Sequence, residues 1–170
     1  MRRALAIGSF VVVVLVTAAT AMAGGRGVVA SANGDYGFSG EAAGSTFEIG
    51  PFTWNVQVKG DGSVKGRFDY TQIRDGGIPL SASGPLTCAF IEGDHVWVGG
   101  VIEASSRASL VGLEMWFQAR DNGEGANAAP DMSSTLGAAA APAGQQYCTD
   151  HPPVRFPFVV GEGNLQVRSG

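Results

Sequence analysis

The sequence has few lysines, few histidines and few cysteines, and no long apolar run follows its first 23 residues. Lysine, histidine and cysteine occur twice each, and charged residues make up 15% of the 170 residues. With 15 acidic against 11 basic residues the net charge is −4, so the surface repels phosphate groups. Nucleic acid and anionic membranes are therefore excluded as preferred partners. No later segment is long and apolar enough to cross a bilayer, which predicts no membrane span after processing.

The N-terminus has the features of a secretory signal peptide in the expected order. Two arginines precede the apolar run FVVVVLV, and small residues at positions 21–23 precede a cleavage site before Gly24. The alternative is an uncleaved membrane anchor, because residues 4–23 are largely apolar. Cleavage after residue 23 leaves 147 residues with nine basic and 15 acidic side chains, hence a net charge of −6. We expect a secreted or otherwise extracytoplasmic protein.

The two cysteines, Cys88 and Cys148, are expected to form one disulfide, since an even pair in an oxidising compartment is usually bonded. The bond would close a loop of about 60 residues, which corresponds to roughly 4 kcal/mol of stabilisation in the chain-entropy account. It requires Cα atoms about 5–6 Å apart. The alternative is two separate buried thiols.

Alternation of apolar and polar residues predicts an all-β domain. In FTWNVQVK, residues 52–59, every second residue is large and apolar, and VKGRFDY, residues 64–70, continues the pattern. The intervening GDGS, residues 60–63, is typical of a tight hairpin turn. Phe68, Tyr70, Trp54 and Phe117 are expected to point inward and to fill the interior.

Further strands follow the same rules. PLTCAFIE and HVWVGGVIE, residues 85–92 and 95–103, predict a second hairpin, and GLEMWFQAR, residues 112–120, alternates again. The predicted fold is an antiparallel meander closed, or nearly closed, into a barrel of about eight or nine strands, because closure removes exposed strand edges. The alternative is a two-sheet β-sandwich.

The remaining segments are predicted to be irregular. Residues 24–33 are expected to form a disordered leader before a single domain at residues 34–170. A long loop is expected at residues 122–147, because the alanine-rich segment 126–144 contains prolines and glycine that interrupt a helix.

Two motifs resemble a group of uncharacterised secreted bacterial β-proteins. They are TCAFIEGDHVWVGGVI, residues 87–102, and FQARDNGEGANAAPD, residues 117–131. The likeness covers roughly residues 35–150 and implies secretion and a β-fold. In the group an apolar strand follows the Pro-Asp, whereas MSSTLGAAAA follows it here. The group has no established activity, so the resemblance transfers no catalytic residue.

The segment RDNGEGANAAPD, residues 120–131, is the candidate metal site. Asp121, Glu124 and Asp131 offer the carboxylate oxygens that calcium prefers. Glycines occupy positions where a calcium loop usually has oxygen ligands, and Asp/Asn/Gly clusters are typical of turns. We therefore expect a turn first and a calcium site as the alternative, with no other cofactor.

No catalytic pattern is recognisable, so no catalytic residue is assigned. His151 lies in the sequence TDHPP, and no Gly-x-Ser-x-Gly motif is present. Glu92, Glu103 and Glu114 lie on predicted strands and leave open a carboxylate pair in a secreted hydrolase or isomerase.

Aromatic residues are the candidate ligand-binding residues. Trp97 and Trp116 fall on the face opposite the core, and His95 is expected beside Trp97. Together they could form a patch for a small apolar or carbohydrate ligand. The alternative is that they cap the core or lie under the alanine-rich segment. The function predicted from the sequence is a secreted, non-catalytic domain with a binding or envelope-structural role; the alternatives are the hydrolase or isomerase and a calcium-stabilised surface module.

Overall fold

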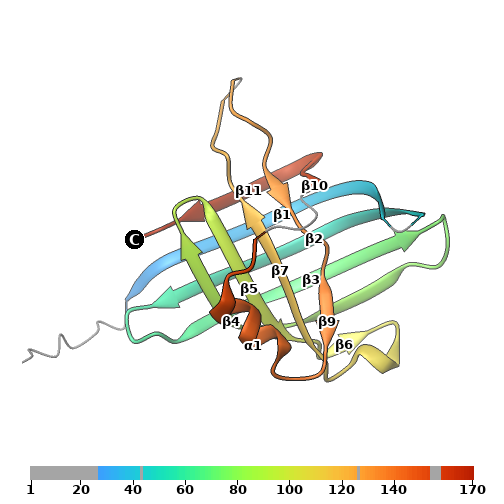
Figure 1. The fold of residues 1–170 in the computed structure, drawn as a ribbon, viewed down its shortest axis with the longest axis horizontal. Helices are drawn as coiled ribbons and strands as arrows, with labels where there is room; N and C mark the ends of the chain where they lie inside the picture. Colours follow the sequence, from blue (N-terminus) through green and yellow to red (C-terminus); the bar gives the residue numbers. More distant parts are fainter. Residues whose placement is uncertain (1–26, 43, 126, 154–157) are drawn as a thin grey trace, which may run out of the picture.

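The structure of the protein is a computed structural model, and it describes residues 27–42, 44–125, 127–153 and 158–170 (Figure 1). The predicted signal peptide lies outside the described residues. No helix within the described ranges is long and apolar enough to cross a membrane. The elements are β1 (Val28–Ala42), β2 (Ser45–Lys59), β3 (Val64–Arg74), β4 (Leu80–Glu92), β5 (His95–Val101), β6 (Ala104–Ser105), the 3-10 turn η1 (Ala108–Leu110), β7 (Glu114–Arg120), β8 (Met132–Ser133), β9 (Gly137–Ala139), α1 (Ala143–Asp150), β10 (Phe158–Val159) and β11 (Glu162–Arg168).

All eleven strands belong to one antiparallel sheet that curls into an open half-barrel. The order is β10-β8-β7-β5-β4-β3-β2-β1-β11, with β6 beside β4 and β9 beside β7. The first part of β4 pairs with β3 and its second part with β5, so one strand joins the two halves. Figure 1 shows β5 and β7 crossing the long strands β1–β3. The all-β antiparallel meander is confirmed, as one continuous sheet.

The number of strands exceeds the predicted eight or nine because four of the eleven have only two or three residues. Strands that short carry too few residues to show alternation. These short strands are recognisable only through their hydrogen-bonded partner strands, which the three-dimensional structure reveals.

The core fills the inner side of the half-barrel. Phe117 of β7 packs against Phe52 and Trp54 of β2, with ring centroids 4.8 and 5.0 Å apart. Phe52 also packs edge-on against Tyr70 of β3 at 5.1 Å. These rings and Phe68 are buried, as the alternation predicts. Small barrels can hold a ligand in their interior. Here aromatic side chains fill that space.

The two edges of the sheet approach each other along a seam that polar contacts bridge. The edge strands β10 and β11 are joined by residues 160–161: the Val160 amide donates to the Asp131 carbonyl beside β8 at 2.9 Å, and the Gly161 amide donates to the Gly37 carbonyl of β1 at 3.0 Å. Across the seam, Asp121 after β7 accepts from the Val167 amide of β11 at 2.9 Å. Inside the seam, the Tyr36 hydroxyl lies 2.8 Å from the Ser133 hydroxyl and accepts a bond from the Trp54 indole at 3.1 Å. Burial of Tyr36 raises the pKa of its phenol, so this group stays neutral.

The predicted disordered leader at residues 24–33 is wrong where the structure describes it. Strand β1 begins at Val28, and its early residues pair with β2 on one side and β11 on the other, for example Ala32 with Val56 and Val167. Residues 24–26 lie outside the described residues. The partner strand β11 is more than a hundred residues away in the sequence, so local composition alone cannot show this pairing.

The predicted long loop at residues 122–147 is also wrong. Strands β8 and β9 and most of α1 lie within it. Strand β8 directly follows Pro130-Asp131, in the place where the resembling proteins have an apolar strand. The prolines do not interrupt α1, because Pro142 stands before its first residue, where a missing amide hydrogen costs nothing.

Candidate functional site

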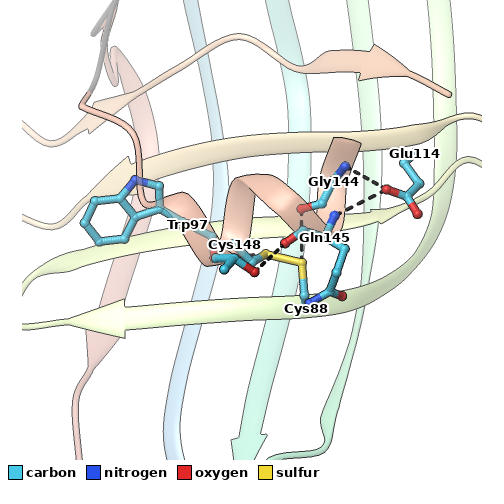
Figure 2. The surroundings of a disulfide bond; sticks show 7 residues. Cys88, Trp97, Glu114, Gly144, Gln145 and Cys148 are labelled. Atoms are coloured by element: carbon cyan, nitrogen blue, oxygen red, sulfur yellow. Dashed lines mark hydrogen bonds between the residues drawn. A yellow bond between two sulfur atoms is a disulfide. The ribbon is translucent and has the colours of Figure 1, made fainter. Parts of the chain in front are cut away.

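Helix α1 lies against the outer face of β4, β5 and β7 (Figure 2). A disulfide joins Cys148 of α1 to Cys88 of β4, with Cα atoms 6.2 Å apart. This confirms the predicted pairing, and separate thiols are excluded. The bond forms in oxidising compartments, which is compatible with an extracytoplasmic protein.

The N-terminus of α1 is capped by a side chain from the sheet. One carboxylate oxygen of Glu114 accepts from the amides of Gly144 at 2.7 Å and Gln145 at 3.3 Å (Figure 2). A negative charge at this end also complements the helix dipole. Gly99 allows the close approach, because a Cβ atom there would lie 2.6 Å from both Cys88 Sγ and the Gly144 carbonyl oxygen.

Six rings gather on the outer face around α1. The imidazole of His95 stacks on Trp97 with centroids 3.7 Å apart, and that of His151 stacks on Phe90 at 3.5 Å. The Trp97 indole donates to the Pro152 carbonyl at 2.9 Å. We call this group the outer aromatic cluster: Phe90, His95, Trp97, Trp116, Tyr147 and His151.

The structure places the three predicted ligand residues on the outer face, opposite the core. His95 and Trp97 lie together, but each is only 6% exposed, because the segment that follows α1 covers them. Trp116 lies 6.0 Å from the Tyr147 ring, and Gly137 of β9 packs against its indole. In this arrangement the rings lie under the chain that follows β7, and no open patch forms. Their role in ligand binding stays a prediction.

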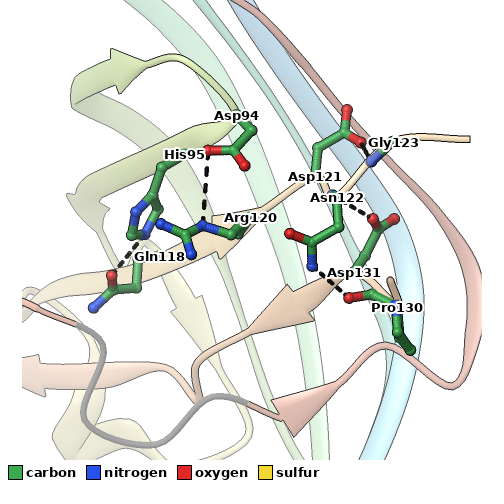
Figure 3. A network of polar contacts seen from close by, with 9 residues as sticks. All are labelled: Asp94, His95, Gln118, Arg120, Asp121, Asn122, Gly123, Pro130 and Asp131. Atoms are coloured by element: carbon green, nitrogen blue, oxygen red, sulfur yellow. Dashed lines mark hydrogen bonds and ion pairs between the residues drawn. The ribbon is translucent and has the colours of Figure 1, made fainter. Parts of the chain in front are cut away.

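His95 is linked to α1 through Gln118. The Gln118 amide nitrogen donates to the Tyr147 hydroxyl, so its oxygen accepts from His95 Nε2 at 2.8 Å (Figure 3). This assigns the proton to Nε2 in the neutral ring. Desolvation by burial lowers the pKa of His95. The ring is therefore held in its neutral form.

Two of the three carboxylates of the candidate metal site, Asp121 and Asp131, bind backbone amides (Figure 3). Asp121 accepts from the Gly123 amide at 2.8 Å and, with its other oxygen, from the Val167 amide at 2.9 Å. Asp131 accepts from the Asn122 amide at 2.9 Å. Within the described ranges no three histidine, cysteine, aspartate or glutamate side chains are grouped to hold a metal, and Glu124 is exposed. The segment is the turn that connects β7 to β8, and Asp121 also ties it to β11.

The candidate catalytic carboxylates are separated. Strand pairing places Glu92 opposite His95 and Glu114 opposite Val101. His95 and Val101 are the two ends of β5, so Glu92 and Glu114 are separated by about 20 Å along the strand direction at the usual rise per residue. Glu103 forms an exposed ion pair with Arg67, with N and O 3.7 Å apart.

His151 ends α1 in a left-handed conformation with φ of 45°. Its ring faces Phe90, as described above. Within the described residues no hydrogen bond joins the His151 side chain to Glu92, Glu103 or Glu114, so a catalytic role of these residues stays a prediction.

Three hollows, which share lining residues, lie on the outer face of the long strands. The largest, about 930 Å³, lies where β1, β2 and the turn before β11 meet, and two of about 320 Å³ adjoin it. Asp35, Pro51 and Asp69 each line two of the three. We call this region the outer hollow. It is open, and its lining is mixed: exposed polar side chains such as Asp35 and Glu48 lie beside apolar ones such as Phe38 and Ile49.

One cross-strand row runs through the outer hollow. Asp35 of β1 pairs with Thr53 of β2, which pairs with Asp69 of β3, which pairs with Ser83 of β4. Sequence reasoning missed this row as a site. Alternation places Thr53 and Asp69 on the solvent side, but only the register of four strands aligns them.

Comparison of the chain with protein-family models, curated proteins and solved structures finds no match. Arguments about function therefore rest on the geometry of the chain itself.

Proposed function

We propose that the chain is an extracytoplasmic binding domain without catalytic machinery, and that it holds a hydrated, polyhydroxylated ligand such as an oligosaccharide in the outer hollow. The observation that carries the proposal is that aromatic rings fill the inner side of the half-barrel, while a hollow on the long strands exposes the polar row of Asp35, Thr53 and Asp69. The N-terminal sequence and the disulfide support export from the cytoplasm.

The side chains of the outer hollow suit hydroxyl groups. Asp35 and Asp69 are acceptors, Thr53 is both donor and acceptor, and Asn55 and Arg67 in the neighbouring row add donors. Adjacent strands lie about 4.8 Å apart, so the rows present polar groups at regular intervals. These regularly spaced donors and acceptors favour a ligand rich in hydroxyls.

A panel of immobilised oligosaccharides, followed by titration calorimetry on the oxidised protein, tests the proposal. Asp69→Ala removes an acceptor from the hollow and should weaken binding roughly 10- to 100-fold, the effect of losing a hydrogen bond to a charged group. Glu41→Ala, an exposed acid on the same sheet outside the hollow, is the matched control and should bind like wild type. Equal effects of the two substitutions, or no binding across the panel, would overturn the proposal.

The second candidate is a secreted hydrolase whose carboxylates are Asp35 and Asp69. The two flank Thr53 on alternate strands, so their Cα atoms lie about 9–10 Å apart. Inverting glycosidases have carboxyl groups about 6.5–9.5 Å apart, so this candidate requires the two side chains to lean toward each other. Release of reducing sugar from any bound oligosaccharide, abolished in both Asp35→Asn and Asp69→Asn, would favour this candidate. Binding without turnover favours the binding domain.

A further inference from the structure

Helix α1 is held to the sheet mainly by one covalent bond. Of its eight residues only Gly144 and Cys148 are buried, so the helix contributes little apolar burial. A helix of this length is not stable by itself in water. The sheet has its main core on the opposite, inner side and does not include α1 in it. The disulfide therefore matters more for α1 than for the sheet.

The other links between α1 and the sheet are polar and few. Glu114 caps the first turn, Gln118 bonds the Tyr147 hydroxyl, and beyond the helix the Trp97 indole bonds the Pro152 carbonyl. Each such bond contributes little net free energy, because water replaces it when the helix leaves. Together with the short helix, these links favour local opening once the covalent bond is absent.

The surface beneath α1 is aromatic. Trp97, His95 and Phe90 lie on adjacent strands, β5 and β4: His95 stacks on Trp97, and Phe90 lies 5.8 Å from Trp97 at a tilt of 50°. Without α1 and residues 151–153 these rings would face solvent. Flat rings with polar edges suit a planar ligand.

We propose that α1 is a cover that reduction of the Cys88–Cys148 disulfide releases, exposing on Trp97 and its neighbours a binding surface for planar aromatic ligands. The reductant is a dithiol. One of its thiolates attacks a protein sulfur and forms a mixed disulfide, and its second thiol then displaces that bond. The products are two protein thiols and the oxidised reductant, so two electrons pass to the protein disulfide.

Access to the sulfurs sets the rate of this reaction. Cys88 and Cys148 are 5% and 7% exposed, so the reductant reaches them when α1 frays. The inference concerns the part of the sheet formed by β4, β5 and β7, whereas the polar row of the outer hollow runs across β1 to β4, and its outcome is independent of the proposed function.

The expected size of the effect follows from the short loop that the disulfide closes locally. Strand β9 ends at Ala139, nine residues before Cys148, and apart from the disulfide the intervening chain is held to the sheet by the polar links to Glu114 and Gln118. A cross-link over a loop of this length favours the closed state roughly 50- to 100-fold in the chain-entropy account. Opening of α1 should rise by this factor on reduction.

Hydrogen exchange before and after dithiothreitol treatment tests the cover, with Cys88→Ser/Cys148→Ser as a permanent mimic. Amides of α1 should lose protection roughly 50- to 100-fold, while amides of β2 and β3 keep theirs. The probe 8-anilinonaphthalene-1-sulfonate, a planar aromatic anion, should gain fluorescence only with the reduced protein. Glu114→Gln with an intact disulfide is the matched control and should neither bind the probe nor release α1.

Three results would overturn the inference. Unchanged protection of α1 after reduction means that packing, not the disulfide, holds the helix. Loss of protection in all strands together means that the disulfide stabilises the whole domain. Probe binding that survives both Trp97→Ala and Phe90→Ala in the reduced protein means that the ligand surface lies elsewhere.

Discussion

Asp121 shows how one carboxylate connects distant parts of a chain. Its two oxygens accept from Gly123 in its own turn and from Val167 in β11. The sequence singles out Asp121 as an oxygen ligand but indicates only the local turn. Val167 is 46 residues away, and no local pattern identifies it as the partner.

Asp121→Asn should destabilise the domain by about 1–2 kcal/mol. Asparagine has only one acceptor oxygen, so its side-chain NH2 group, itself a donor, would face one of the two backbone amides that Asp121 now binds. Asp131→Asn is the matched comparison: Asp131 accepts through one oxygen, which an asparagine retains, so a change within about 0.5 kcal/mol is expected. Urea unfolding midpoints measure both. Equal losses would show that the turn does not depend on the bridge to Val167.

At the scale of elements, alternation identifies the strands well and the helix not at all. The hairpin at residues 60–63 is confirmed: Gly62 has φ of 80°, and Asp61 accepts from the Ser63 amide at 3.0 Å. The turn before His95 likewise has Gly93 at φ of 59°. These turns depend on adjacent residues. Helix α1 depends on Glu114 and Cys88, which are far from it in sequence.

Gly99→Ala tests the fit between α1 and β5. The added methyl would meet Cys88 Sγ and the Gly144 carbonyl, so the helix must shift, and we expect a loss of about 1–3 kcal/mol. Gly27→Ala is the control, since a Cβ there meets nothing within 4 Å, and should be near neutral. Thermal unfolding of the oxidised proteins compares them. A neutral Gly99→Ala would mean that α1 packs less closely than the structure shows.

At the scale of the whole molecule, stability should depend on pH through His95 and Asp131 in opposite directions. Burial lowers the pKa of His95, so below about pH 6.5 the unfolded chain binds a proton that the folded chain does not, and stability falls as the solution is acidified. Burial raises the pKa of Asp131, so the folded state holds the extra proton and stability falls as pH rises above about 4.

Unfolding free energies from pH 7.5 to 5 check the contribution of His95. Wild type should lose stability as the pH falls, and His95→Gln, which keeps a donor toward Gln118, should lose clearly less. If the stability of His95→Gln changed with pH as that of wild type does, the pH dependence would come from a group other than His95. Asp131→Asn should flatten the curve near pH 4 and leave the higher range unchanged.

The seam also belongs to the whole molecule. A closed or nearly closed barrel is predicted because exposed strand edges are unfavourable. The structure is an open half-barrel in which polar contacts join the two sides of the seam. The Tyr36 and Ser133 side chains that meet inside the seam come from elements 97 residues apart. Their meeting is a consequence of how far the sheet curls.

The sequence by itself determined which residues form the long strands, which of their faces point inward, and which two cysteines pair. Alternation and turn residues are local signals, because they depend on neighbouring residues, and two cysteines allow only one intramolecular pairing. Only the tertiary structure decided the short strands, the placement of α1 over the outer aromatic cluster and the polar row of the outer hollow. Each of these requires contacts between residues far apart in the chain, and the sheet register that creates them is set by global packing.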